Sequence, residues 1–334
     1  MKSRILYLDI IRGIACLMII LMHAPKPYSA NSMVLSGISL MTAPSIGLFF
    51  MISGALILPV IMSTQVFLKR RLTKIAIPAV LWSLIFLLVK FFEDNNWEAF
   101  LKSIISIPFS TQGCAVYWFI YALAGLYLIA PIISPWLHKT SKREIEIFLL
   151  FWLVTLCEPV LRPYISINEN YSKALYYFGG YVGYFILGYY LHNYTIIWKK
   201  WILVAMLIVP LCSAAICKLT DLNINFYDMF WYLTIPSASM CTALFLLAKK
   251  YFESKSVNRD IVKFITNFSK CSFGIFLIHF FILRNILWKF DLTFIPYGGG
   301  IFETFILATT SSYLITYLIS YFSMSEYLIG YRRK

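Results

Sequence analysis

Apolar stretches long enough to cross a lipid bilayer recur along the whole of this 334-residue chain. The hydrocarbon core of a bilayer is about 30 Å thick, so a spanning helix needs about 20 apolar residues. Lipid offers no hydrogen bonds to the backbone, so such stretches must form helices. We therefore expect an all-α polytopic integral membrane protein with ten spans, over residues 5–24, 38–61, 74–92, 115–136, 145–164, 174–192, 200–218, 227–248, 263–288 and 301–323.

The charged residues support this fold class and predict an orientation. Only 13% of the residues are charged and 60% are hydrophobic, whereas soluble domains have about 25% charged residues. The net charge of +14 would suit nucleic acid, but lysines and arginines lie in short clusters between the spans, which is typical of membrane orientation. Nineteen of them fall on the side of the termini and seven on the other side. We expect both termini in the cytoplasm, the bilayer as a partner, and no nucleic acid.

The chain shows no sign of a division into domains. It has no linker, repeat or low-complexity tract, and its longest loop, residues 93–114, is too short to fold alone. The expected organisation is one transmembrane domain, residues 1–334, without a separate soluble domain. Gly179 and Gly183 have the G-x-x-x-G spacing that allows close packing of helices. The seven cysteines include no C-x-x-C pair, so we expect neither a disulfide framework nor a metal site.

Three ionisable residues share one face of the first span. Arg12 and His23 are eleven residues apart, which leaves them about 20° apart around a helix axis and about 16 Å apart along it. Asp9 lies one turn before Arg12. Ionisable side chains inside a bilayer usually face a bundle interior or a wet cavity, so this stripe is a candidate site. The alternative is an interfacial histidine above an Asp–Arg pair that only anchors the helix.

The chemistry of these side chains gives each a candidate role. His23 is suited to take and return a proton near neutral pH. Asp9 and Arg12 are too far along the axis to touch it, so they line the same cavity nearer the cytoplasm or pair with each other at i, i+3. A second histidine, His279, also falls in the outer half of its span, where it acts in catalysis or serves as a packing residue.

A basic cluster forms another candidate site. Arg70, Arg71 and Lys74 stand where a short loop meets the third span. Positive-inside orientation explains such cations without further function. Adjacent arginines are also what a phosphate-bearing ligand needs, because a guanidinium group binds phosphate through paired hydrogen bonds.

Three further residues are weaker candidates for substrate binding. Ser53 lies within the second span, and Tyr117 and Trp118 lie at the outer end of the fourth. An interfacial aromatic belt explains a tyrosine and a tryptophan at this depth. A face that stacks on a sugar is the alternative interpretation.

Several well-known catalytic motifs are missing from the sequence. It contains no G-x-S-x-G, H-E-x-x-H or Walker A pattern, and none of its histidines begins the H-x-x-x-x-D pattern of a soluble-type acyltransferase. Hydrolase, metalloprotease and ATP-driven pump activities therefore lose support.

Five short elements, in order along the chain, together resemble the membrane-bound acyltransferase 3 family of bacterial surface-carbohydrate acyltransferases. Each element alone is weak, and the five in sequence are specific. They are LD-x-x-RG with an Arg-x10-His spacing (Leu8, Asp9, Arg12, Gly13, His23), FF-x-x-SG (Phe49, Phe50, Ser53, Gly54), RR-L-x-K-I-x-x-P (Arg70, Arg71, Lys74, Pro78), YWF (Tyr117, Trp118, Phe119) and SFGIFLIH (residues 272–279).

The resemblance implies an O-acyltransferase of the bacterial inner membrane. It implies acyl-coenzyme A, usually acetyl-CoA, as the cytoplasmic donor, and a hydroxyl of a cell-surface or lipid-linked carbohydrate as the acceptor. It carries over His23 as the essential base, Arg12 as its companion, and Arg71 as the donor-binding arginine. Where many members have a second arginine three residues later, this sequence has Lys74, which cannot form a bidentate contact.

These inferences combine into one mechanistic hypothesis. Arg70, Arg71 and Lys74 would hold the phosphates of coenzyme A, and its pantetheine arm would pass Asp9 and Arg12 towards His23. His23 would then take the proton from a sugar hydroxyl, with direct transfer and an acyl-histidine intermediate both open. Two other functional classes also stay open. One is a transporter or flippase of a lipid-linked sugar, and the other is a scaffold or sensor among cell-envelope assembly proteins.

Overall fold

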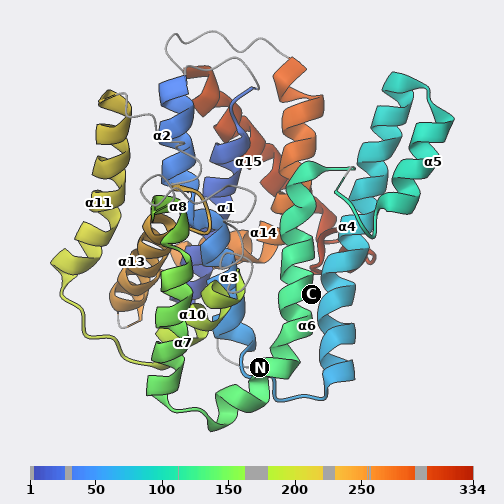
Figure 1. Ribbon diagram of the computed structural model, residues 1–334. Helices are drawn as coiled ribbons and strands as arrows, with labels where there is room; N and C mark the ends of the chain where they lie inside the picture. The colour runs from blue at the N-terminus through green and yellow to red at the C-terminus, as the bar shows by residue number, and fades with distance from the viewer. Residues whose placement is uncertain are drawn as a thin grey trace. The chain divides into compact units, whose positions relative to one another are not determined.

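The computed structural model describes residues 4–26, 32–111, 113–161, 180–220, 230–253, 255, 257–289 and 299–333. All regular secondary structure within these ranges is helical, as the sequence predicts (Figure 1). Seven helical segments there are long and apolar enough to cross a membrane. They run over Leu6–His23, Val34–Ile57, Thr64–Asp94, Ala115–Lys139, Lys200–Cys217, Arg259–Lys289 and Gly300–Ile319. The chain is therefore an all-helical membrane protein.

Seven of the ten predicted spans correspond to these segments, and three do not. The stretch 145–164 is divided between α7 (Lys142–Thr155) and α8 (Glu158–Leu161). The described part of 174–192 forms α10 (Val182–Asn193), and that of 227–248 forms most of α13 (Ile235–Phe252). Neither α10 nor α13 is among the helices with both the length and the hydropathy of a span. A count of ten and the cytoplasmic location of the termini stay predictions.

The chain folds into two compact units, each built from two stretches of sequence. The first unit comprises Met1–Pro59 and Ile132–Ser269, and the second comprises Val60–Pro131 and Lys270–Lys334. Each predicted site residue belongs to one of these units.

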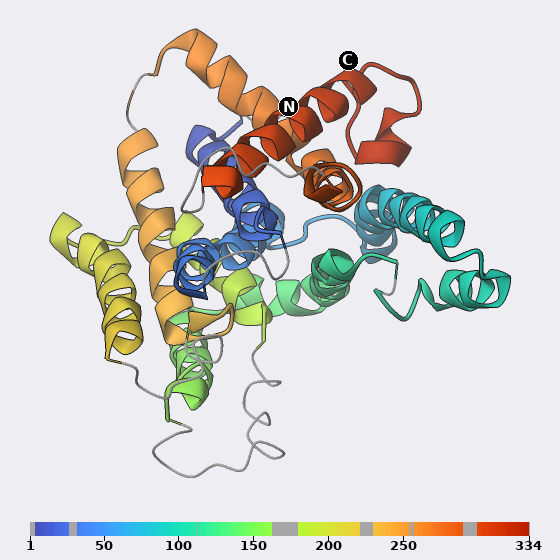
Figure 2. The same cartoon turned by 90° about the horizontal axis from the view of Figure 1, so that it is seen from above.

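The first unit is built around α3 (Pro44–Ile57). Its other helices are α1 (Leu6–His23), α2 (Ser32–Thr42), α7, α8, α10, α11 (Lys200–Leu219) and α13. Helix α1 packs against α2, α3 and α13, while α10 lies along α3. Seen from above, α11 lies beside α13 (Figure 2).

Glycines bring the backbones of α3 and α10 into direct contact. A side-chain carbon at Gly54 would lie 1.7 Å from the carbonyl oxygen of Phe185, and one at Gly188 would lie 1.9 Å from that of Met51. Gly183 similarly packs against the ring of Trp152, at 2.1 Å from where its side-chain carbon would be. Small residues therefore set the helix spacing here. The predicted packing role is confirmed for Gly183, whereas Gly179 lies outside the described residues.

The second unit is organised by the long helix α4 (Thr64–Asp94). It also contains α5 (Trp97–Ser106), η1 (Ala115–Tyr117), most of α6 (Trp118–Lys139), most of α14 (Arg259–Asn285), η2 (Leu287–Lys289), α15 (Gly299–Ile319) and α16 (Ser325–Ile329). Aromatic rings fill its interior, where Phe86 contacts Tyr117, Phe280 and Phe281. The indole nitrogen of Trp82 donates a hydrogen bond to the Leu328 carbonyl at 3.0 Å, which ties α16 to α4.

Candidate active site

The predicted ionisable residues Asp9, Arg12 and His23 all lie on one unbroken helix, α1. It runs over Leu6–His23, close to the predicted span 5–24. Because the helix is continuous, Arg12 and His23 are about 16 Å apart along its axis. Asp9 is only 5% exposed, whereas Arg12 and His23 are both half-buried. The two basic side chains are therefore partly accessible, and the acidic one is enclosed.

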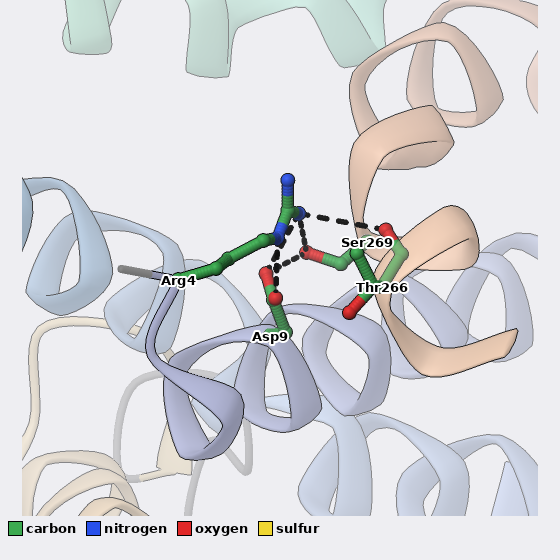
Figure 3. Close-up of polar contacts among 4 residues, drawn as sticks. All are labelled: Arg4, Asp9, Thr266 and Ser269. Atoms are coloured by element: carbon green, nitrogen blue, oxygen red, sulfur yellow. Dashed lines mark hydrogen bonds and ion pairs between the residues drawn. The ribbon is translucent and has the colours of Figure 1, made fainter. Parts of the chain in front are cut away.

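Asp9 is enclosed by a network of hydrogen bonds at the start of α1 (Figure 3). Nε and Nη2 of Arg4 bind its two carboxylate oxygens at 2.5 and 2.9 Å. The hydroxyl of Ser269, on α14, donates to Oδ1 of Asp9 at 2.6 Å. Nη2 of Arg4 is also 3.4 Å from the Thr266 carbonyl and from the Ser269 hydroxyl. Both oxygens of the buried carboxylate thus have partners.

This network fixes the first turn of α1 against α14. The Asp9–Ser269 hydrogen bond joins α1 to α14, and the bidentate contact with Arg4 fixes the direction of the carboxylate that accepts it. The geometry makes Asp9 a positioning residue for the helix that carries Arg12 and His23. Its predicted tasks, as a cavity wall or as an i, i+3 partner of Arg12, stay predictions. Sequence reasoning missed Arg4, because it precedes the helix and counted only as an orientation signal.

A second set of contacts holds the same end of α1 to α10 and α13. The Tyr7 hydroxyl and Nδ1 of His192 form a hydrogen bond. Lys249, on α13, donates to the carbonyls of Leu191 and His192 at 2.9 and 2.8 Å. These carbonyls end α10, where a cation is favourable because of the helix dipole. The two polar networks give α1 a fixed base within the first unit.

The other end of α1, which carries His23, has aromatic neighbours. The Tyr232 hydroxyl lies 3.2 Å from the sulfur of Met22, the residue before His23. The ring of Trp231 lies 4.2 Å from that of Tyr232, measured between centroids. The Tyr184 hydroxyl donates to the Tyr232 carbonyl at 2.6 Å and so holds this segment in place. Sequence reasoning missed this pair, because Trp231 and Tyr232 sit in a predicted span without a recognisable motif.

The basic cluster lies in the first turns of α4, in the second unit. Arg70 is exposed and Arg71 is half-buried, and neither forms an ion pair with any residue that the structure describes. Lys74 instead pairs with Glu326 of α16 at 2.7 Å. The two arginines are therefore available to an anionic ligand, and Lys74 is already engaged.

The carboxyl-terminal segment is held close to this cluster by backbone contacts. Pro78 has no N–H, so the Lys74 carbonyl lacks its usual helical donor. A side-chain carbon at Gly330 would lie 2.9 Å from that carbonyl oxygen. Gly330 also has φ of 67°, which glycine adopts without strain. The segment after α16 thus passes directly beside Lys74.

Two of the remaining candidates of the second unit, His279 and Tyr117, are more deeply buried. His279 is fully buried, and its Nδ1 donates to the Phe276 carbonyl at 2.7 Å. Because that carbonyl can only accept, Nδ1 carries the hydrogen of this bond. Tyr117 is also buried, and its hydroxyl donates to the Leu277 carbonyl at 2.8 Å. Trp118 is half-buried, as is Ser53 in the first unit. Their proposed roles in substrate binding stay predictions.

A comparison with protein families shows which family the chain belongs to. The family model of the acyltransferase domain Acyl_transf_3 matches residues 5–324. The chain belongs to the acyltransferase 3 family. No match was found among curated proteins or among solved structures. The matched range covers most of both units and all seven apolar segments. The protein is therefore a membrane acyltransferase.

Among the residues that the structure describes, no group of three or more His, Cys, Asp or Glu side chains could hold a metal ion.

Proposed function

We propose that this protein transfers an acetyl group from cytoplasmic acetyl-CoA to a hydroxyl of a cell-surface or lipid-linked carbohydrate, in the inner membrane of a bacterium. The observation that carries the proposal is the placement of Arg12 and His23 on one continuous helix, both half-buried, with the far end of that helix fixed by the Arg4–Asp9 pair. Membership of the acyltransferase 3 family supports acyl transfer in general.

The donor is assigned to the arginines of α4. Coenzyme A carries several phosphates, and a guanidinium group binds phosphate through paired, charge-assisted hydrogen bonds. Arg70 and Arg71 have no competing ion pair among the described residues. Lys74 would have to release Glu326 before it could bind a phosphate. We therefore place the main donor contacts on the two arginines, with Lys74 secondary.

The proton transfer is assigned to His23. Its imidazole takes the proton of the acceptor hydroxyl while that oxygen attacks the thioester carbonyl. The carbon–sulfur bond breaks, the acetyl group stays on the sugar oxygen, and the coenzyme A thiolate takes the proton from the imidazolium. General base catalysis of this kind contributes about 10²- to 10⁴-fold in rate. Arg12 lies on the same helix face as His23 but about 16 Å away along the axis. It would therefore contact the donor rather than the reacting atoms.

The decisive experiment follows label from radiolabelled acetyl-CoA into the carbohydrate fraction of membranes. Wild-type protein is compared with His23→Ala at matched expression, and with His138→Ala as a control, because His138 is an exposed histidine in the last turn of α6. We expect label with wild type and His138→Ala, and about 10²-fold less or none with His23→Ala. Equal labelling by wild type and His23→Ala would remove His23 from the mechanism. If wild-type membranes take up no more label than membranes that lack the protein, the proposed donor or the proposed acceptor is wrong.

A further inference from the structure

An apolar groove lies between α11 and α13 in the first unit, and none of the predicted site residues lines it. The two helices lie side by side in Figure 2. The groove has a volume of about 520 Å³ and is open along one side, which is within the range of about 300–1,000 Å³ for small-molecule sites. Its lining includes Trp201, Val209 and Pro210 of α11, with Phe230, Ile235 and Pro236 from the start of α13 and the residues before it.

The two serine hydroxyls in the lining already have partners within the protein. Pro210 has no N–H, so the Met206 carbonyl lacks a helical donor. The Ser239 hydroxyl, from α13, donates to that carbonyl at 3.0 Å. The Ser213 hydroxyl donates to the Val209 carbonyl of its own helix at 2.8 Å. The groove therefore suits a hydrocarbon chain rather than a polar ligand.

The length of the groove matches one leaflet of a bilayer. Its lining on α11 extends from Trp201 to Ser213, which is about 18 Å of helix. Half of the hydrocarbon core is about 15 Å thick. Trp201 stands at one end and is 66% exposed, and tryptophan favours the level of the lipid headgroups. An acyl chain in the groove would thus begin at Trp201.

Lysines from two segments gather at the Trp201 end. Lys199 and Lys200 begin α11, and Nζ of Lys250, in the last turns of α13, lies 3.5 Å from the Trp198 carbonyl. Nζ of Lys255 lies 4.2 Å from the centre of the Tyr251 ring.

The electrostatics of Tyr251 show that these lysines share one region. A hydrogen bond from Lys255 and the nearby charges of Lys255 and Lys200 hold the pKa of Tyr251 below its usual value. The neighbouring carboxylate is that of Glu253, whose charge acts on Tyr7 and Lys249. The region has more cations than anions, which favours a phosphate.

We propose that this groove binds one anionic phospholipid, with an acyl chain between α11 and α13 and its phosphate among Lys199, Lys200 and Lys250. The lipid belongs to the leaflet on the lysine side. Since α13 also packs against α1, the bound lipid supports the helix that carries His23. The proposal does not depend on the proposed function, because lipid binding is measured without any acyl transfer.

The test titrates the purified full-length protein in detergent with phosphatidylglycerol, phosphatidylcholine or undecaprenyl phosphate, and counts bound lipids by native mass spectrometry. We expect the first phosphatidylglycerol to bind about tenfold or more tightly than phosphatidylcholine. Changing Lys199, Lys200 and Lys250 to Gln together should abolish that preference. Ala205→Phe, which fills the groove where Ala205 lines it, should weaken binding of the first lipid while leaving the lysines in place.

A matched control changes Lys139, Lys142 and Arg143 to Gln, which removes the same charge from another basic cluster. It should leave the lipid preference intact. An equal loss in this control, equal binding of the two phospholipids, or full binding by Ala205→Phe would each overturn the proposal. Tighter binding of undecaprenyl phosphate than of phosphatidylglycerol would overturn the assigned occupant.

Discussion

The start of α1 and the start of α4 both carry charged residues, but these differ in how far they are buried and paired. At α1 the carboxylate of Asp9 is 5% exposed and both of its oxygens are bound. At the start of α4, Arg70 is exposed and Arg71 is half-buried, and the ion pair of Lys74 with Glu326 is nearly half exposed on both sides. A buried pair is strongly destabilising to break, whereas exposed charges contribute little to stability and remain available to ligands. The first arrangement holds a helix in place, and the second can bind an anion.

The largest expected effect comes from breaking the pair at α1. Arg4→Gln leaves Asp9 buried without its cation. It should lower the free energy of unfolding by about 2 kcal/mol, less than for a fully buried pair, because the Arg4 side chain is 40% exposed and screened by solvent. Unfolding by SDS, followed by circular dichroism, measures the change. The double variant with Arg4→Gln and Asp9→Asn should lose less than Arg4→Gln alone, because no unpaired charge is left. A larger loss in the double variant would show that the pair is not what holds this turn.

A smaller effect, on binding and not on stability, is expected at α4. Arg71→Gln should raise KM for acetyl-CoA about tenfold, equivalent to about 1.4 kcal/mol, with little change in kcat. Arg71→Lys should recover only part of the loss, since lysine cannot form the paired contact. Lys69→Gln removes a neighbouring exposed cation and serves as the control for general electrostatic attraction. The same KM for Lys69→Gln and Arg71→Gln would mean that Arg71 makes no specific contact.

The smallest effect is expected for the exposed pair of α4. Glu326→Gln should change the free energy of unfolding by less than about 0.5 kcal/mol, because exposed ion pairs contribute little. It should also lower KM for acetyl-CoA slightly, about twofold, because Lys74 gains freedom to meet a phosphate. Raising the ionic strength should erase this difference in KM. A loss of stability as large as that of Arg4→Gln would remove the contrast between the two helix starts.

The sequence predicts the parts of this molecule that depend on local pattern. Helix α1 and the other six apolar segments follow from length and hydropathy, and the shared face of Arg12 and His23 follows from helix geometry. The partners of the charges could not be predicted in this way. Ser269 is 260 residues from Asp9, and Glu326 is on a different helix from Lys74, so no periodicity relates them. Residues such as His192 and Lys249 gain their roles only where α10 and α13 meet α1.

The predicted stretch 145–164 shows a second limit. Hydropathy averages over about 20 residues, so it does not register where a helix ends within an apolar stretch. Within residues 145–164, helix α7 ends at Thr155 and the short helix α8 begins at Glu158. The FF-x-x-SG element shows a different limit. Its Gly54 belongs to a sequence motif that suggests function, but the close approach of α10 explains why a glycine is needed there.

The contact of α3 with α10 also constrains how the first unit can move. Where Gly54 meets Phe185 and Gly188 meets Met51, the two main chains interlock without intervening side chains. A slide of either helix by one residue would drive a backbone carbonyl into the opposite chain. We therefore expect α3 and α10 to move together as one rigid body in any opening of this unit.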